Sequence, residues 1–461
     1  MQKDHYHLIG IGGIGMSAIA LALFKQGFSV SGSDLKENNL ITQLKDLGIY
    51  IFLKQEESNI DFIKNKYNEK KIHIVKTSAI KKSNIELQYC LKHNLKIKHR
   101  SEVLALIMKQ YNSIAVAGTH GKTTTSTFLS TLLDLITKDS SSIVGGIVPL
   151  YNSNAHIKNS KYLVAEIDES DGTAANYESE LSIINNIDFD HCDHYSNTNE
   201  IISSFRDFAN KSKRLLINND CPITSSNFKS KYSWSIKTIE NIAFSMIPKK
   251  ITKNETVANY YENGSWIDEL SIPVAGLHNL SNVTAAISAC RMNNISFLKI
   301  KENIKYLKLP RKRFEFRGEF LKRIIIDDYA HHPKEIKATI ELARLMINDE
   351  KYKKKKRLVV IFQPHRYSRV KKFAEEFARE LSNADLILLT EIYSAGEQKI
   401  NKINSEFIAE KILLRNKNIK CVRNNYEIHK KFIDLTHKND FIVNMGAGDC
   451  HNLWDILNEQ K

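Results

Sequence analysis

The sequence lacks the features of a secreted, disulfide-rich or membrane-embedded protein. Its six cysteines are scattered and form no C-x-x-C pair, which is typical of reduced thiols in a cytosolic protein. No apolar run approaches the length of a membrane span, and Asp4, His5 and His7 precede a first apolar stretch that glycines interrupt. We therefore expect a cytoplasmic protein with neither a signal peptide nor a membrane partner.

A basic helix interleaved with aromatic residues is also missing, although the formal net charge is +15. Lysines are spread along the chain, and their dense run at 353–356 directly precedes an apolar stretch at 358–362 that is typical of a strand. Such a run indicates a solvated loop. The charge suits small anionic substrates about as well as a polynucleotide, and we expect no nucleic-acid partner.

The composition is that of a globular protein with several domains. The chain has 461 residues, of which 42% are hydrophobic and 26% charged, and this length favours about three domains. Strand-like and helix-like stretches alternate, which predicts the α/β class. We place one boundary near residue 108, in the last turn of an expected helix at 101–109, and another at a basic, hinge-like stretch at 310–318, giving domains 1–107, 108–309 and 310–461. For residues 221–272 the sequence predicts only short alternating pieces.

The central feature is a glycine loop between a short apolar run at 113–116 and a helix-periodic stretch at 128–136. The loop reads Gly118-Thr119-His120-Gly121-Lys122-Thr123-Thr124. Strand, glycine loop and helix in this order form a cradle for phosphate, because backbone N–H groups and the positive helix end face the anion. Lys122 could reach the β- and γ-phosphates, and the Thr123 hydroxyl could hold Mg²⁺. Val116 stands where the longer form of this motif has glycine, and a plain strand–helix turn is the alternative.

A second glycine loop opens the chain. An apolar strand at 6–9 leads into a G-x-G-x-x-G pattern at 10–15, an apolar helix follows, and the next strand ends at Asp34. By spacing alone this pattern predicts a Rossmann dinucleotide site, and an NAD-type oxidoreductase would explain it. Any diphosphate could bind at the same helix end.

Acidic residues follow two buried strands of the middle third. The stretch 162–167 ends at Asp168, Glu169 and Asp171, just after Glu166, and acids beside a phosphate loop can hold the nucleotide's Mg²⁺. A solvated acidic turn is the alternative. The next strand ends in a His/Cys/Asp cluster at 188–194, where a zinc site is one interpretation and a single His of this loop facing a hard cation beside the nucleotide is another.

Later polar residues fall at helix starts and strand ends. His278 and Asn279 open an expected helix, where caps are the common role of such side chains. After residue 310, four strands end in polar or glycine-rich segments, and ligands of parallel α/β sheets bind at such ends. We therefore expect a second site in the third domain, formed by segments 327–333, 363–369, 391–397 and 445–449.

Together and in this order, these motifs resemble the Mur ligase family. The residues that carry the resemblance span nearly the whole chain: 10–17, 118–125, 166–172, 190–191, 278–282, 327–333, 365–369 and 445–449. The shortened Gly-Thr-x-Gly-Lys-Thr loop is the family's form, so Val116 fits it. One departure is Ala18, where glycine is expected. The resemblance implies a Rossmann-like first domain, a P-loop ATPase-like central domain and a Rossmann-like third domain.

The resemblance also implies roles for individual residues. The first loop would bind the UDP part of a substrate through Gly10, Gly12, Gly13, Gly15, Met16, Ser17 and Asp34. ATP would be bound by Gly118, Thr119, His120, Gly121, Lys122, Thr123, Thr124, His278 and Asn282, the last two near adenine. Mg²⁺ would lie near Thr123, Glu166 and His191, and the third domain would present His365, Arg366 and Arg369 to the substrate. The catalytic residues would be Lys122, Glu166, His191 and Arg366.

The implied activity is ATP-dependent formation of an amide bond. The closest resemblance is to members that join L-alanine to the lactyl carboxylate of UDP-N-acetylmuramate through an acyl phosphate, releasing ADP and phosphate for peptidoglycan synthesis. A tripeptide-adding, muropeptide-recycling ligase is the alternative within the family, and a P-loop nucleic-acid ATPase is the alternative from another class. We expect a monomer or a homodimer.

Overall fold

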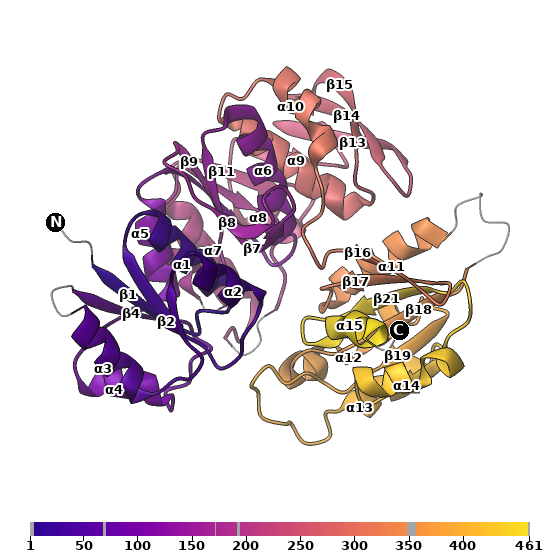
Figure 1. The fold of residues 1–461 in the computed structure, drawn as a ribbon. Coiled ribbons are helices and arrows are strands. Elements are labelled where there is room, and N and C mark those ends of the chain that lie inside the picture. Colours follow the sequence, from indigo (N-terminus) through magenta and orange to yellow (C-terminus); the bar gives the residue numbers. More distant parts are fainter. Residues whose placement is uncertain (1–3, 68–70, 171, 191–193, 348–355, 460–461) are drawn as a thin grey trace.

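A computed structural model describes residues 4–67, 71–170, 172–190, 194–347 and 356–459, and all structural statements below concern these ranges. Three β-sheets flanked by helices follow one another along the chain and form three domains (Figure 1). The predicted α/β class with three domains is confirmed.

The first domain contains a parallel five-stranded sheet in the order β3-β2-β1-β4-β5. The strand order reverses beside β1, so the crevice where ligands bind in such sheets opens at the first glycine loop. The strands are β1 (His5–Ile9), β2 (Ser29–Ser33), β3 (Tyr50–Phe52), β4 (Ile72–Lys76) and β5 (Lys96–His99). The helices are α1 (Ile14–Lys25), α2 (Asn39–Asp46), α3 (Glu57–Lys66), α4 (Ile85–Lys92) and α5 (Arg100–Met108).

The central domain has a ten-stranded sheet in the order β15-β14-β13-β12-β11-β10-β6-β9-β7-β8. Strand β6, which leads into the phosphate loop, pairs in parallel with β9 and β10 on its two sides. The strands are β6 (Asn112–Ala117), β7 (Ser140–Val148), β8 (Ser153–His156), β9 (Tyr162–Glu166), β10 (Leu181–Ile184), β11 (Leu215–Asn218), β12 (Tyr232–Ser235), β13 (Phe244–Ile251), β14 (Thr256–Glu262) and β15 (Ser265–Ile272). The helices are α6 (Lys122–Thr137), α7 (Thr198–Asn210), α8 (Pro222–Asn227), α9 (Leu277–Met292), α10 (Phe297–Asn303), η1 (Thr173–Asn176) and η2 (Ile304–Tyr306).

The short alternating pieces expected between residues 221 and 272 form one end of this sheet. Strand β12 continues the parallel part, and β13, β14 and β15 then pair as antiparallel neighbours. Strand β14 alternates buried and partly exposed residues, because one face of an antiparallel sheet packs on the core and the other faces solvent.

The third domain has a six-stranded sheet in the order β16-β17-β21-β18-β19-β20, parallel except for β16. Its predicted strands are confirmed, and each ends toward the polar segments named above. The strands are β16 (Glu315–Phe320), β17 (Arg323–Asp328), β18 (Leu358–Phe362), β19 (Leu386–Leu389), β20 (Ile419–Cys421) and β21 (Phe441–Met445). The helices are α11 (Pro333–Ile347), α12 (Tyr367–Leu381), α13 (Ser405–Leu413), α14 (Asn425–Leu435), α15 (Leu453–Asn458) and η3 (Cys450–Asn452).

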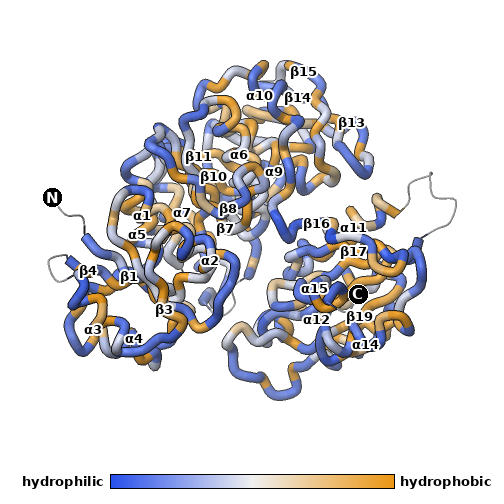
Figure 2. Tube along the Cα trace, in the orientation of Figure 1, coloured by the Kyte–Doolittle hydropathy of each residue, from blue (hydrophilic) through white to orange (hydrophobic). Residues whose placement is uncertain are grey.

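The two domain junctions differ in character. Apolar residues gather inside each domain (Figure 2), and one buried cluster continues from α1 and α5 of the first domain to β9 and α7 of the central domain. Two other clusters cover the two faces of the third sheet, and Phe189 of the central domain packs against one of them. The first two domains therefore share a core, whereas the third domain keeps its own.

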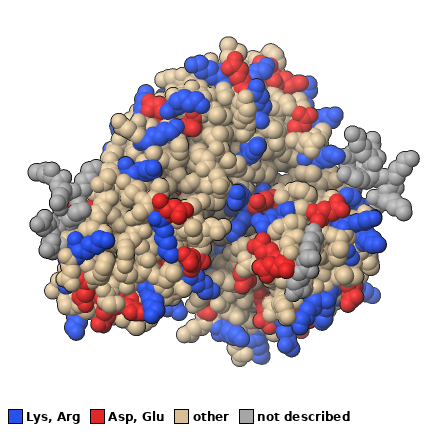
Figure 3. All heavy atoms as spheres, in the orientation of Figure 1, with Lys and Arg blue, Asp and Glu red and all other residues tan. Residues whose placement is uncertain are grey.

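Charged residues of both signs are interspersed over the face of the molecule shown in Figure 3. Within the coloured residues of that face, no continuous basic track is seen. None of the helices in the described part of the chain combines the length and apolar character that a bilayer crossing requires.

Candidate active site

The phosphate loop is held by its neighbour strand. The N–H of Thr119 donates to the carbonyl oxygen of Asn186, and the N–H of His120 donates to the Asn186 side chain at 2.8 Å. Gly118 and Gly121 have φ of 136° and 79°, and a Cβ on Gly121 would come within 2.4 Å of Asn282 Oδ1. Glycine is therefore required at 121 by both backbone conformation and space.

Lys122 folds back over the loop. Its Nζ donates to the carbonyl oxygens of Gly118 at 2.6 Å and Thr119 at 3.2 Å, and it lies 2.9 Å from Glu169 Oε1. Burial lowers the pKa of Lys122, but nearby carboxylates, led by Glu169 and then Asp168, outweigh it and leave the pKa raised. The ammonium is therefore charged and close to the loop's backbone, where phosphate oxygens would bind.

Thr123 and Glu166 bring two oxygen donors together beside the loop. Thr123 Oγ1 donates to Glu166 Oε1 at 2.9 Å, and the N–H of Gly145 donates to Glu166 Oε2 at 2.6 Å. Burial raises the pKa of Glu166, although the Lys122 charge opposes this shift. A hydroxyl and a carboxylate are ligands that Mg²⁺ prefers, so this pair fits the predicted ion.

The third predicted metal ligand, His191, lies outside the described residues. Among the residues that are described, no group of three or more His, Cys, Asp or Glu side chains has the arrangement of a metal site. The magnesium site therefore stays a prediction that rests on Thr123 and Glu166.

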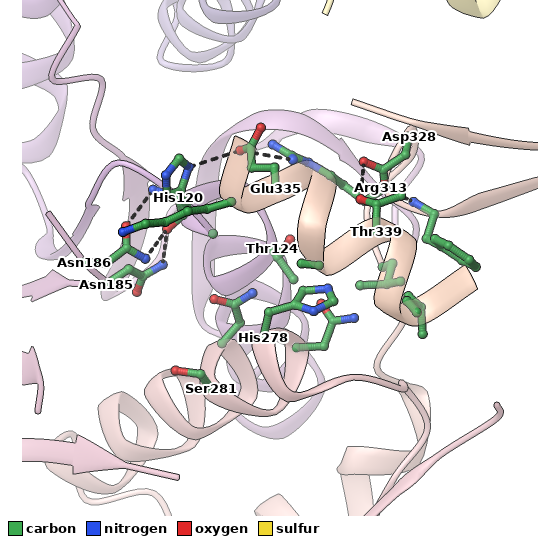
Figure 4. A pocket seen from close by; sticks show the side chains of 18 residues that line it. His120, Thr124, Asn185, Asn186, His278, Ser281, Arg313, Asp328, Glu335 and Thr339 are labelled. Atoms are coloured by element: carbon green, nitrogen blue, oxygen red, sulfur yellow. Dashed lines mark hydrogen bonds and ion pairs between the residues drawn. The ribbon is translucent and has the colours of Figure 1, made fainter. Parts of the chain in front are cut away.

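A cavity of about 250 Å³ lies beside the phosphate loop, between the central and third domains (Figure 4). His278 and Asn282, four residues apart on α9, line it together with Thr124 of the loop helix. Helix α9 begins after Gly276 without a side-chain cap, so the capping role considered for His278 and Asn279 is wrong. Burial and the Arg313 charge lower the pKa of His278 to about 4, so its imidazole is neutral at pH 7.

Two acids bind His120 between the central and third domains. Its Nδ1 lies 3.3 Å from Glu335 Oε1 on α11, and its Nε2 lies 3.5 Å from Asp188 Oδ2. Lys334 Nζ also reaches Asp188, at 2.5 Å. Burial lowers the pKa of His120, but the neighbouring carboxylates of Asp188 and Glu335 outweigh burial and raise the pKa to about 9. The phosphate loop is thus tied to the third domain by charge.

The third-domain residues that line the cavity are Arg313, Phe314, Asp328, Lys334, Glu335, Ala338, Thr339 and Leu342. Asp328 lies within the predicted segment 327–333, whereas sequence reasoning missed the other seven as site residues. The segment around Arg313 was expected to be a hinge, yet it forms one wall. Asp328 accepts from the N–H of Phe314 at 2.7 Å and from Thr339 Oγ1 at 3.1 Å, which fixes that wall. The only sequence signal was the acid pair at the end of the strand at 324–328.

The first glycine loop is braced from two sides. Asp34 Oδ2 accepts from the N–H of Gly12 at 2.9 Å, so this acid orients the loop itself. Asn154 of the central domain donates to the carbonyl oxygen of Ile14 and to Ser17 Oγ. Met16 and Ser17 are each only 2% exposed, and their contact with substrate stays a prediction, as does that of Asp34 and of glycines 10, 12, 13 and 15.

The predicted third-domain residues lie together at the start of α12. Arg369 makes a two-pronged contact with Asp190 of the central domain, with Nη2–oxygen distances of 2.9 and 3.0 Å, and both side chains are buried. His365 lies 3.2 Å from Arg369 Nη1 and stacks on Tyr393. Arg366 Nη1 is 3.9 Å from Glu397. Their roles toward substrate remain predictions.

Three family models match successive parts of the chain: the Mur ligase family catalytic domain at residues 5–112, the Mur ligase middle domain at 116–290, and the Mur ligase glutamate ligase domain at 312–448. The chain belongs to the Mur ligase family. Members of this family are ATP-dependent ligases.

Named relatives of this Mur ligase agree with the match. UDP-N-acetylmuramate–L-alanine ligase of Prochlorococcus marinus subsp. pastoris is 61% identical over 463 residues, covering 100% of this chain and 98% of that protein. The crystal structure of UDP-N-acetylmuramate-alanine ligase from Thermotoga maritima has a TM-score of 0.82 and 26% identity, covering 99% and 98% of the two chains. A murein peptide ligase from Psychrobacter arcticus, with a TM-score of 0.72, 20% identity and 98% coverage of both chains, shares the fold.

Proposed function

We propose that this Mur ligase joins L-alanine to the lactyl carboxylate of UDP-N-acetylmuramate in peptidoglycan precursor synthesis, converting ATP to ADP and phosphate. The observation that carries the proposal is the meeting of the central and third domains at one phosphate loop. Lys122 lies on the loop, Asn282 stands beside it, and Glu335 of the third domain contacts its histidine. The 61% identical relative, which bears this activity in its name, supports the same substrates.

The chemistry explains why such a site needs cations. A carboxylate does not condense with an amine in water, because the oxygen that must leave is a poor leaving group. Transfer of the γ-phosphoryl group of ATP to the lactyl carboxylate gives an acyl phosphate. The neutral amine of L-alanine then attacks the acyl carbon, the C–N bond forms, the C–O bond breaks and phosphate leaves, while the nitrogen gives up one proton to phosphate or solvent. Two anions must meet in the first step, so positive charge lowers its barrier.

Each part of the site has a role in this scheme. Lys122 would neutralise the ATP phosphates, His278 and Asn282 would contact adenine, and Arg366 would act on the substrate side with His365 and Arg369. Thr123, Glu166 and His191 would hold Mg²⁺, which supplies charge neutralisation at the phosphate oxygens when bound. Closure of the third domain would exclude water, which otherwise hydrolyses the acyl phosphate.

One assay tests the proposal. Phosphate release from ATP is measured with UDP-N-acetylmuramate and either L-alanine, the tripeptide L-Ala-γ-D-Glu-meso-diaminopimelate, or no amine. We expect rapid release with L-alanine alone, together with an equal amount of amide product. Preferred use of the tripeptide would instead assign the recycling activity, and release stimulated by DNA or RNA would assign a nucleic-acid ATPase.

We also propose that the enzyme works in the cytoplasm as a monomer or a homodimer. Free thiols support the location: the described cysteines, at 90, 221, 290, 421 and 450, form no disulfide. Light scattering of the purified protein across a range of concentrations measures the oligomeric state directly.

A further inference from the structure

One arginine lies between the first glycine loop and the acids beside the phosphate loop. Arg100 is the first residue of α5, the helix that connects the first domain to the central domain. Its Nη2 lies 3.0 Å from Asp168 Oδ2, and a Cβ on Gly15 would come within 2.6 Å of its Nη1. The side chain is 17% exposed. A single guanidinium group therefore touches elements of two domains.

Asp168 connects this arginine to the ATP side. It follows β9, two residues after Glu166, and its carboxylate also accepts from the N–H of Ser170 at 3.0 Å. Its charge acts on Lys122 as well as on Arg100. Arg100, Asp168 and Lys122 thus form a series of positive, negative and positive charges from the first glycine loop to the phosphate loop.

The other end of Arg100 faces the start of α1. Gly15 lies in the first turn of this 12-residue helix, which has no acidic side chain in that turn. Residues 10–17 themselves contain no lysine or arginine. A diphosphate at this helix end would find backbone N–H groups from the loop and a forked cation from Arg100, whose planar donors match phosphate oxygens.

We propose that Arg100 binds the diphosphate of UDP-N-acetylmuramate and that Asp168 holds its guanidinium in position. This inference rests on the proposed function and adds to its first-domain site a residue from the connection between domains. The ion pair with Asp168 fixes the orientation of the Arg100 guanidinium group before substrate binds, so the side chain loses less conformational freedom on binding. It also sets the distance between the substrate diphosphate and the phosphate loop.

The test measures the affinity of the full-length protein for UDP alone and for ATP by calorimetry. In Arg100→Met we expect UDP to bind roughly 10- to 100-fold more weakly, the usual loss for a hydrogen-bonded charge pair, with ATP affinity within about twofold of wild type. KM for UDP-N-acetylmuramate should rise by a similar factor while kcat changes little. UDP carries no lactyl carboxylate, so an unchanged UDP affinity overturns the proposal even if the muramate substrate binds more weakly.

Lys109→Met is the matched control. Lys109 follows the same helix at its other end, at the junction of the two domains, and lies 3.3 Å from Glu178, with both side chains exposed. The Lys109→Met substitution removes one positive charge at a position that contacts neither loop, so UDP affinity should stay at the wild-type value. An equal loss in both variants would mean that net charge or the domain junction causes the effect, and the proposal would be wrong.

Two further variants separate positioning from folding. Asp168→Asn leaves Arg100 charged but weakens its anchor, so UDP affinity should fall by less than in Arg100→Met. Arg100→Lys keeps the charge and loses the fork, so it should bind UDP with intermediate affinity. If Arg100→Met does not fold, Arg100→Lys decides: a loss of UDP affinity of at least about threefold supports the proposal and wild-type affinity overturns it.

A wild-type protein that binds UDP but makes no product with L-alanine contradicts the proposed function alone, because the UDP titrations still test Arg100.

Discussion

The two glycine loops of this chain share one plan but carry different side chains. Each follows a buried parallel strand, each opens with a glycine of positive φ, and each starts a helix. In the phosphate loop, the ammonium group of Lys122 contacts the loop's own backbone, and the hydrogen-bonded oxygens of Thr123 and Glu166 lie beside it. The first loop contains no charged side chain between residues 10 and 17.

This difference corresponds to two chemical tasks. A diphosphate that must only be held can rely on backbone N–H groups and a helix end. A phosphoryl group that must be transferred needs fixed positive charge where the transition state develops negative charge. The surroundings differ in the same sense: the first loop adjoins a core shared by two domains, whereas the phosphate loop meets the third domain through ion pairs. The first loop is suited to holding a diphosphate in a fixed position, and the phosphate loop is suited to closure of the third domain.

The largest effect is expected on removing the Lys122 charge, which should affect the phosphate loop but not the first loop. In Lys122→Met we expect kcat to fall by about 10²- to 10³-fold, because one preorganised cation at the transferred phosphate is lost. UDP-N-acetylmuramate affinity should be unchanged, which a titration of the purified variant measures.

The buried Glu169 loses the Lys122 ammonium group in that variant, so Glu169→Gln is added as a companion change that also removes the carboxylate charge. Near-normal amide formation by the double variant would show that the phosphate loop does not activate the substrate. A parallel loss of UDP-sugar affinity would show that the two loops are not separate sites.

The second prediction concerns the dependence of stability on pH through His120 of the phosphate loop. The pKa of His120, raised to about 9 by Asp188 and Glu335, lies above the ordinary value of about 6.5. Its contribution to stability is therefore complete below pH 6.5 and is lost as pH rises through 9. We expect the free energy of unfolding to fall by about 2–3 kcal/mol between pH 7 and 9.5, measured by urea denaturation.

Glu335→Gln tests the origin of that slope. Removing one of the two carboxylates should move the loss to lower pH, because the pKa of His120 drops toward its ordinary value. An unchanged slope in this variant would mean that another group is responsible and that the loop is not tied to the third domain through His120.

The third prediction uses one substitution in both loops. Gly121→Ala should destabilise the protein by about 1–2 kcal/mol, because alanine is disfavoured at a φ of 79°, and should raise KM for ATP by displacing Asn282. Gly15→Ala meets only the flexible end of Arg100, so stability should hold or rise while UDP affinity falls. Gly48→Ala is the control, since Gly48 has φ of 88° and no atom within 4 Å of the added Cβ. Loss of ATP affinity in that variant would disprove the role of the Asn282 contact.

The sequence predicted both loops because strand, glycine turn and helix are local features. It could not predict their connections, because the partners are distant: Arg100 and Asp168 are 68 positions apart, and His120 and Glu335 are 215 apart. The segment around Arg313 was interpreted as a hinge because its basic, aromatic composition fits an exposed turn as well as a cavity wall. For His278, the two interpretations differed only in where α9 begins, and its start after Gly276 decided between them.

The smallest expected effect concerns the brace of the first loop. Asn154 crosses from the central domain to Ile14 and Ser17, so Asn154→Ala should cost about 1 kcal/mol and weaken UDP binding a few-fold while KM for ATP stays unchanged. Asn84→Ala is the matched control: it removes the N-cap of α4, which belongs to the first domain but is not part of the loop, at a similar cost. Equal UDP affinities in the two variants would mean that the first loop keeps its shape without the central domain. A loss of UDP affinity in Asn154→Ala alone would mean that the first loop depends on the central domain, with which the first domain shares a core.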